Sequence, residues 1–305
     1  PDGTAMAVYT LDRSRTGNTN YYEIGYTIVD VNGDLGASMI ATSDNWVDEN
    51  PQVIAADFSG DERFVIGWHS MRNGTSDIQL LAVDAGGAMS NTFPASLSEL
   101  TTSGQATVGG NFRFATLSGS NNEVEDLTVI WSEQINDEMD LSGLTISAHS
   151  VLKAAKFLPD GTGYRLSAAL ELAELDADTL TDHFSAYVSG DDEVKAVIQA
   201  TFYNQSNPES IPDAEDDTKS ITVPGETVML YTATSNFQEH AVEVEEVYPD
   251  YENLMAGSLV AIQFTVRNTG LQDLTDLTIT MGANETAELS GTLKPNESTV
   301  LTVYH

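Results

Sequence analysis

The feature that most constrains the fold of this chain is a short apolar strand that recurs along the sequence. Its copies are rich in β-branched residues, end near Tyr, Trp or a polar replacement, and occupy residues 5–10, 64–69, 127–132 and 195–200. Each copy follows a turn rich in Gly, Ser or Asp and precedes polar residues. A unit that recurs at wide spacing and cannot bury its own face predicts a repeat fold of stacked sheets.

Neighbouring segments repeat in the same order as the aromatic strand. Before the last three copies, an apolar segment ends in Ser-Gly, at residues 51–61, 112–120 and 183–191. A strand that ends in such a turn and meets a second strand predicts a β-hairpin. After the first two copies comes Val-Asp-x-x-Gly, at residues 29–33 and 83–87, where Gly supplies the positive φ of a tight turn. Each unit is therefore predicted to be a four-stranded antiparallel meander with a weaker outer strand, such as residues 35–42 or 89–97.

We expect these meanders to stack radially as the blades of a β-propeller. The predicted blades cover residues 1–48, 49–105, 106–180 and 181–236. A β-sandwich with chance similarity between its strands is the alternative. The chain opens on what looks like a turn without its leading strand, so either the blades close as a small ring or the chain is a segment of a longer protein, which we favour. Residues 150–157 and 166–175 have helix-forming composition, and repeat alignment makes the second an outer strand, so both interpretations stay open.

Residues 1–235 resemble the propeller repeats of bacterial extracellular proteins. Those blades combine a Gly-rich turn, a Val-Val-x-Trp strand and a turn of the Asp-x-x-Gly kind. Trp68 and Trp131 match the aromatic position, whereas Tyr9 and Gln199 depart from it. The sialidase Asp-box, Ser-x-Asp-x-Gly-x-Thr-Trp, is absent. The resemblance implies a propeller-like protein that is secreted or attached to the cell wall, and it does not extend to sialidases.

The pattern changes at residue 237, and residues 237–305 are predicted to form an Ig-like β-sandwich. Residues 241–248 alternate apolar and acidic side chains, as a half-buried strand does, and further short strands follow at regular spacing. The run Phe264-Thr-Val-Arg-Asn-Thr-Gly and the later Leu-x-Pro-x-Glu-Ser at residues 293–298 resemble CARDB-type and related Ig-like domains of bacterial surface proteins. The chain contains no cysteine, so the core of this domain must hold it without a disulfide.

The net charge of the chain limits the kinds of molecule that it can bind. The 305 residues include 47 Asp and Glu against 12 Lys and Arg, for a formal net charge of −35. Such a surface repels phosphates, so it disfavours nucleic acids and anionic membranes, and no apolar run is long enough to insert in a membrane. Acidic composition without cysteine favours an extracellular bacterial protein, with a halophilic origin as the competing explanation.

The sequence shows no catalytic motif, so catalytic residues are unknown. The five histidines are scattered, and none of the zinc-protease, serine-hydrolase, P-loop or Rossmann patterns is present. Asp30, Asn32 and Asp34 resemble the start of a calcium loop, with oxygens at alternate positions. The downstream Glu is missing, so turn chemistry is the preferred interpretation and no cofactor is expected, with calcium as the alternative. The acidic run at residues 213–217 is interpreted as a solvated loop, again with calcium as an alternative.

The tryptophans are the candidates for carbohydrate stacking. Trp68 and Trp131 occupy equivalent positions of the repeat, which favours packing between blades. Trp46 lies in a polar loop and is the better candidate for a binding residue, although packing between blades is preferred for it too.

Three functions remain. The preferred one is a non-catalytic adhesion or ligand-presentation module of a larger surface protein, with a protein or glycan partner. The alternatives are a glycan-active hydrolase or lyase with its site on a propeller face, which needs converging carboxylates, and a purely structural stalk.

Overall fold

The regular secondary structure of the described residues is almost entirely β-sheet. A computed structural model describes residues 3–13, 22–44, 46–72, 74–101, 106–117, 123–139, 146–175, 179–212, 220–249, 259–282 and 285–305. These residues contain no α-helix, and their helical turns are the 3-10 segments η1 (Val124–Asp126) and η2 (Gly190–Asp192). The predicted all-β class is therefore confirmed, and none of the sheets closes on itself. No described segment forms a helix long and apolar enough to cross a lipid bilayer.

The first sheet has six strands in the order β1-β2-β4-β5-β6, with β3 paired to β2. These strands are β1 (Ala5–Asp12), β2 (Tyr22–Val29), β3 (Met39–Ile40), β4 (Val47–Asp57), β5 (Glu62–Arg72) and β6 (Thr75–Asp84). β4 and β5 form the predicted hairpin, and Ser59 and Gly60 in its turn have φ angles of 56° and 92°. The predicted outer strands are much reduced, because Leu35 and Met89 make only isolated bridges and β3 has two residues.

The second sheet follows the order β10-β9-β8-β7, and β11 also pairs with β9. Its strands are β7 (Ala106–Thr116), β8 (Leu127–Met139), β9 (Ile146–Asp160), β10 (Gly163–Leu166) and β11 (Leu170–Leu175). The segments for which helix and strand both stayed open are strands here. Alternate residues of β9 enter different hydrophobic clusters, Leu152 and Ala154 on one face and Ala155 and Phe157 on the other. Only the two-residue period of a strand divides neighbouring side chains in this way.

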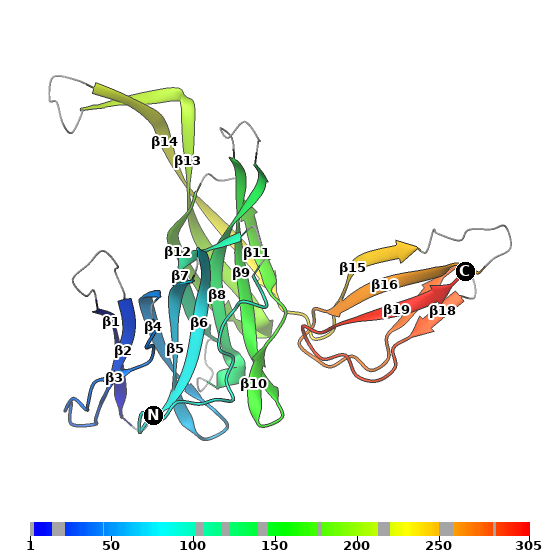
Figure 1. Cartoon of the computed structure of the whole chain (residues 1–305), viewed down its shortest axis with the longest axis horizontal. Helices are drawn as coiled ribbons and strands as arrows, with labels where there is room; N and C mark the ends of the chain where they lie inside the picture. The colour runs from blue at the N-terminus through cyan, green and yellow to red at the C-terminus, as the bar shows by residue number, and fades with distance from the viewer. Residues whose placement is uncertain are drawn as a thin grey trace.

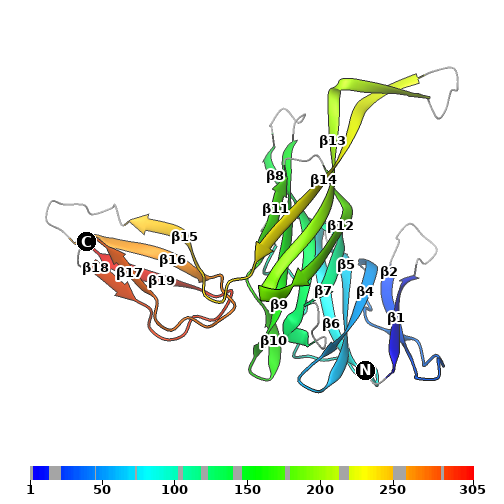
Figure 2. The same cartoon turned by 180° about the vertical axis from the view of Figure 1, so that it is seen from behind.

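The third sheet is a meander whose last two strands project beyond it. Its strands are β12 (Thr179–Ser189), β13 (Glu193–Pro212) and β14 (Ser220–Asn236). Pairing of β12 with β13 ends at Thr201, whereas β13 and β14 stay paired as far as Pro212 and Ser220, which leaves a two-stranded ribbon (Figures 1 and 2). The register of this ribbon shifts between Asn204 and Glu209, after which β13 pairs with β14 again as far as Pro212. The acidic run 213–217 lies outside the described residues.

The C-terminal region contributes two small sheets, in the orders β15-β16-β19 and β17-β18. Their strands are β15 (Val242–Pro249), β16 (Ala261–Asn268), β17 (Thr278–Met281), β18 (Glu285–Glu288) and β19 (Ser298–Tyr304). β15 forms where a strand was predicted, but it is not half-buried, since Val244 and Val247 are 51% and 50% exposed. It is an edge strand, and among the described residues no second layer covers it.

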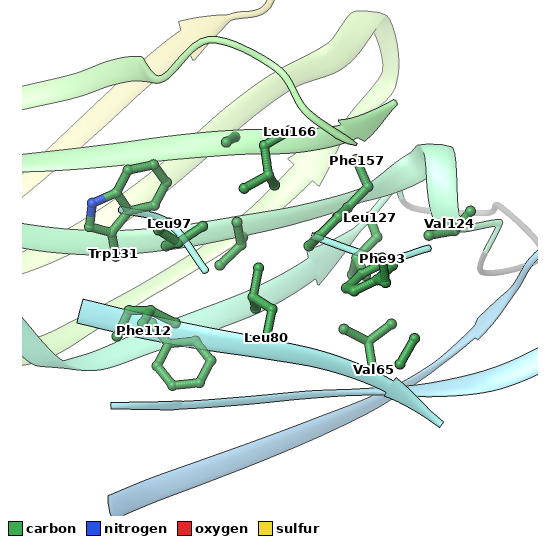
Figure 3. Close-up of a cluster of buried hydrophobic side chains, with 14 of the residues drawn as sticks. Val65, Leu80, Phe93, Leu97, Phe112, Val124, Leu127, Trp131, Phe157 and Leu166 are labelled. Carbon is green, nitrogen blue, oxygen red and sulfur yellow. The ribbon is translucent and has the colours of Figure 1, made fainter. Parts of the chain in front are cut away.

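Three hydrophobic clusters hold the described structure together, one within the first sheet and two between successive sheets. The first cluster packs the β1–β3 end of the first sheet against β5 and β6, and it contains Ile24, Tyr26, Ile66, Trp68 and Val83. The second cluster lies between β4–β6 and the second sheet, and Figure 3 shows Val65 and Leu80 from one side with Phe112, Leu127, Trp131 and Phe157 from the other. The third cluster joins the second and third sheets and includes Ile130, Leu152, Phe184, Val194 and Ile198.

Both recurring tryptophans are packing residues: Trp131 packs between the first and second sheets, and Trp68 packs within the first sheet, while packing between propeller blades stays a prediction. Trp68 is 6% exposed and Trp131 is fully buried. The sheets approach closely at this level, because a Cβ on Gly67 would lie 2.7 Å from the Phe112 ring. Trp131 also has its indole Nε1 satisfied, since it donates to Glu133 Oε1 at 2.7 Å. The aromatic position of the repeat is therefore a packing position in both copies.

We expect Trp131→Ala to lower the free energy of unfolding by about 3–5 kcal/mol, because it leaves a large cavity between two sheets. Urea denaturation of the whole chain measures the change. Leu35→Ala is the matched control, since Leu35 is 72% exposed, and its effect is expected to stay within about 0.5 kcal/mol. Equal effects of the two substitutions would contradict the packing role.

Candidate functional site

Trp46, the predicted binding residue, lies in the loop that leads into β4. Its side chain is half-buried, and its main-chain N–H donates to Asp44 Oδ1 at 3.0 Å. This bond makes a local turn in which the position of Trp46 is tied to that of an acidic side chain. Sugar binding by Trp46 stays a prediction.

The Asp30 turn is held by its own hydrogen bonds. Asp30 Oδ1 accepts from the main-chain N–H of Asp34 at 2.9 Å and of Asn32 at 2.8 Å, and these bonds lower the pKa of Asp30. Asp84 makes the same turn in the second repeat, where Oδ1 accepts from Gly86 and Ala88. Turn chemistry accounts for the first Asp in both copies, and calcium binding by Asp30, Asn32 and Asp34 stays a prediction.

A cavity of about 820 Å³ lies where the second and third sheets meet the C-terminal region. It is lined by Leu117, Glu125, Asp126, Lys156, Leu158, Pro159, Arg165, Asp192, His240, Leu271, Gln272, Asp273 and Pro295. Leu271 also packs against the third hydrophobic cluster, so the C-terminal region is seated on the body of the protein. Figure 1 shows this region beside β9 and β10.

The junction concentrates positive charges that are scarce elsewhere. Lys156, whose side chain is 6% exposed, pairs with Asp192. Arg165 lies 3.8 Å from Glu297 and 4.0 Å from Asp273, and Lys294 pairs with Asp160. Three of the 12 Lys and Arg residues thus lie at this junction, and each is paired with at least one carboxylate.

A second group of ionisable side chains lies near the start of β2 and β4. The two strands pair in parallel at Tyr22 and Val47, so the next residues, Glu23 and Asp48, are neighbours. Asp44 approaches from the preceding loop, and one carboxylate oxygen of each of the three acids lies within 4.8 Å of the others. Glu23 is 5% exposed and Asp48 is fully buried.

Hydrogen bonds orient the carboxylate of Glu23. Glu23 Oε2 accepts from the Thr42 hydroxyl at 2.7 Å, and Glu23 Oε1 accepts from the main-chain N–H of Asp44 at 3.1 Å. Arg72 Nη2 lies 3.6 Å from Asp44 Oδ2 and is the nearby cation. Burial raises the pKa of Asp48, and the charge of Asp44 raises it further, against the opposing effect of the Ser70 hydroxyl.

Sequence reasoning missed this group. Residues 43–48 drew attention through Trp46, and Glu23 lies far from them in the sequence without a motif to connect them. The parallel pairing of β2 with β4 brings the acids together. Parallel pairs are usually recognised in a sequence by the helix that connects their strands, and no such helix lies among the described residues between β2 and β4.

Asp77 on β6 lies in the same cross-strand row as Asp48 and Ser70. Ser70 on β5 is the cross-strand neighbour of both Asp48 on β4 and Asp77 on β6. Asp77 accepts from the Ile78 N–H and from the Gln79 amide, each at 2.8 Å. Burial nevertheless raises the pKa of Asp77 to about 6.

Comparison with known proteins adds little to this geometry. No protein-family model and no curated protein matches the chain. Among solved structures, a glycosyl hydrolase from Bacteroides ovatus is similar with a TM-score of 0.38 and 10% identity, covering 100% of this chain and 81% of that chain. A TM-score this low does not establish a common fold, and nothing about function follows from it.

The raised pKa of Asp77 predicts a pH dependence. The unfolded chain ionises Asp77 near its ordinary pKa of 3.8, while the folded chain keeps the proton up to about pH 6. The folded state then binds more protons, so this group lowers stability as the pH rises through that window. Relative to Asp77→Asn, the wild-type free energy of unfolding is expected to fall by about 2–3 kcal/mol between pH 4 and 7. Denaturation curves across this range measure the difference, and parallel curves for the two proteins would contradict it.

The junction ion pair yields a second prediction. Asp192→Asn is expected to lower the free energy of unfolding by about 3 kcal/mol, because it leaves the buried Lys156 ammonium without its counter-charge. Asn also tolerates the φ of 56° at this position, so the backbone is not the cause. Lys156→Met is the matched control with a smaller expected loss, since the Asp192 side chain is 31% exposed and stays solvated. Chemical denaturation of the three proteins compares them, and the reverse order of stability would be inconsistent with a buried pair.

Proposed function

We propose that this chain is a non-catalytic binding module of a larger extracellular or cell-wall-attached bacterial protein. In this proposal the first three sheets form four propeller-type blades, an Ig-like sandwich follows them, and the body presents a surface to a protein partner. The observation that carries the proposal is the outer face of the third sheet, called the apolar face below, which bears exposed apolar side chains beside polar ones such as Lys195 and Thr232.

The apolar face is the side of the third sheet that points away from the second sheet. Phe184, Ile198 and Tyr231 face the third cluster in one cross-strand row. Residues of the opposite parity therefore point outward. They include Tyr187, Val197, Val228 and Leu230, which are 55%, 48%, 51% and 73% exposed. In Figure 2 the strands β12, β13 and β14 lie on the near side of the molecule.

An exposed apolar sheet face of this kind indicates a protein partner. Large apolar side chains grouped on one face mark interaction surfaces, and aromatic residues such as Tyr187 are enriched at protein interfaces. The net charge of −35 favours a partner whose apolar patch is flanked by basic residues. Beyond Thr201 the ribbon of β13 and β14 has no third described strand beside it, so its edges also offer main-chain groups for pairing.

The blade interpretation is supported by the order of packing. One hydrophobic cluster connects the β1–β3 part of the first sheet with its β5–β6 part, and two more connect the first sheet to the second and the second to the third; blades in a propeller pack on their neighbours in the same sequential order. The Ig-like interpretation is supported by the two small antiparallel sheets, β15-β16-β19 and β17-β18. Val266, Leu293, Leu301 and Val303 are buried within that region.

Two observations favour binding over catalysis. The tryptophans of the repeat are used for packing, and the acidic side chains Asp192, Asp273 and Glu297 at the junction each face a cation. A glycosidase instead needs two carboxyl groups placed on either side of a bound sugar. The second candidate, a glycan-active enzyme, draws on the remaining carboxylates of the junction cavity, Glu125 and Asp126.

The test is a binding screen of the purified chain against secreted and surface proteins, run beside a glycan array. We expect a protein partner, and we expect Val228→Ser with Leu230→Ser to weaken its binding at least tenfold without changing the melting temperature. Val31→Ser is the matched control, since Val31 is 65% exposed in the turn after β2, away from the third sheet, and its binding should equal that of the wild type.

Three results would overturn this function. Release of reducing ends from a polysaccharide panel would favour the enzyme. Glycan binding that is lost in Trp46→Ala, without a protein partner, would favour a lectin-like module. If the assays detect no protein binding, no glycan binding and no hydrolysis, a structural stalk would be favoured.

A further inference from the structure

The strongest unexplained feature of the described structure is the carboxylate of Asp48. It is fully buried, and neither of its oxygens has a partner in good hydrogen-bond geometry among the described residues, although the Ser70 and Thr42 hydroxyls are close enough to lower its pKa. A buried carboxylate without donors is costly. Its position therefore points to a positive group that compensates it.

The neighbouring side chains cannot supply that compensation. The single hydroxyl proton of Thr42 is donated to Glu23. Ser70 Oγ accepts from Arg72 Nε at 3.1 Å, and its hydroxyl has one proton to donate. The two carboxylate oxygens of Asp48 can accept several hydrogen bonds, so this one donor is too few. Arg72 lies 3.6 Å from Asp44 and offsets one negative charge. When all three carboxylates are ionised, one guanidinium leaves a local charge of about −2, which only a bound cation or a proton on Asp48 would offset.

We propose that Glu23, Asp44 and Asp48 bind one Ca²⁺ ion, which joins the start of β2 to the start of β4. Two oxygens that bind the same Ca²⁺ at about 2.4 Å lie no more than about 4.8 Å apart. The three carboxylate oxygens meet this limit, since they lie within 4.8 Å of one another. A divalent cation also matches the local charge.

The ligand type selects calcium. The three acids offer oxygen alone, without the nitrogen or sulfur ligands that zinc prefers. Magnesium demands a near-ideal octahedron, whereas calcium accepts irregular sets of carboxylates, carbonyls and water. The hydrogen bonds from Thr42 and from the Asp44 N–H to Glu23 orient that ligand, as outer partners do in metal sites.

The ion would act as a structural clamp within the first sheet. Main-chain pairing between β2 and β4 is described at one position, Tyr22 with Val47. A cation held by Glu23 on β2 and Asp48 on β4 adds a second link at the same place. It would also order the loop that holds Trp46, because the Trp46 N–H is bonded to Asp44.

The experiment uses the whole chain after treatment with chelator. We expect added CaCl₂ to raise the melting temperature in a saturable way, at about 0.1–1 mM as in extracellular calcium modules. MgCl₂ at the same concentration should produce a smaller rise and so controls for screening of the net charge. Isothermal titration should show a site that Asp48→Asn and Glu23→Gln each weaken at least tenfold.

Two controls make the result decisive. In chelator, Asp48→Asn should melt no lower than the wild type, because it removes a buried charge, so its loss of calcium response cannot reflect misfolding. Asp30→Asn should keep the full response. The proposal is overturned if calcium does not stabilise the wild type, if Asp48→Asn and Glu23→Gln respond as it does, or if Asp30→Asn alone loses the response. Failure to find a protein partner would not affect these measurements.

Discussion

The structure depends on strands that bury apolar side chains on both faces. On β8, Ile130 enters the third cluster while its neighbours Val129 and Trp131 enter the second. On β5, Val65 and Ile66 likewise enter different clusters. Each inner sheet therefore supports two cores at once, and neighbouring sheets stabilise one another in sequence order. A sheet at the end of such a stack has one face without a neighbour, which is the physical basis of the proposed binding surface.

The excess of acidic over basic side chains is the second constraint on this molecule. Twelve Lys and Arg residues cannot pair with 47 Asp and Glu, so most carboxylates must remain in water, where their desolvation cost is avoided. The chain places three of its cations at the junction with the C-terminal region. At the start of β2 and β4 it buries carboxylates with one cation nearby. That imbalance is the reason a metal ion is proposed there and not at the exposed Asp30 turn.

Some elements followed from local pattern alone. The Ser-Gly hairpin between β4 and β5 was predictable because turn residues and β-branched runs act over a few residues. Other elements depended on distant contacts. The segment that became β9 has the composition of a helix, and burial of its two faces against different sheets made it a strand. The outer strands were predicted too long, because residues 35–42 and 89–97 make few sheet contacts.

The sequence by itself determined the all-β class, the main hairpins and the use of Trp68 and Trp131 for packing. These properties depend on the two-residue period of apolar side chains and on short turns, which are local. Tertiary structure alone decided which acids meet, because Glu23 and Asp48 become neighbours through a parallel strand pair. It also decided which apolar residues stay exposed, since no further described sheet packs on the outer face of β12–β14. Both outcomes depend on the order of sheets in space, which no short window of sequence encodes.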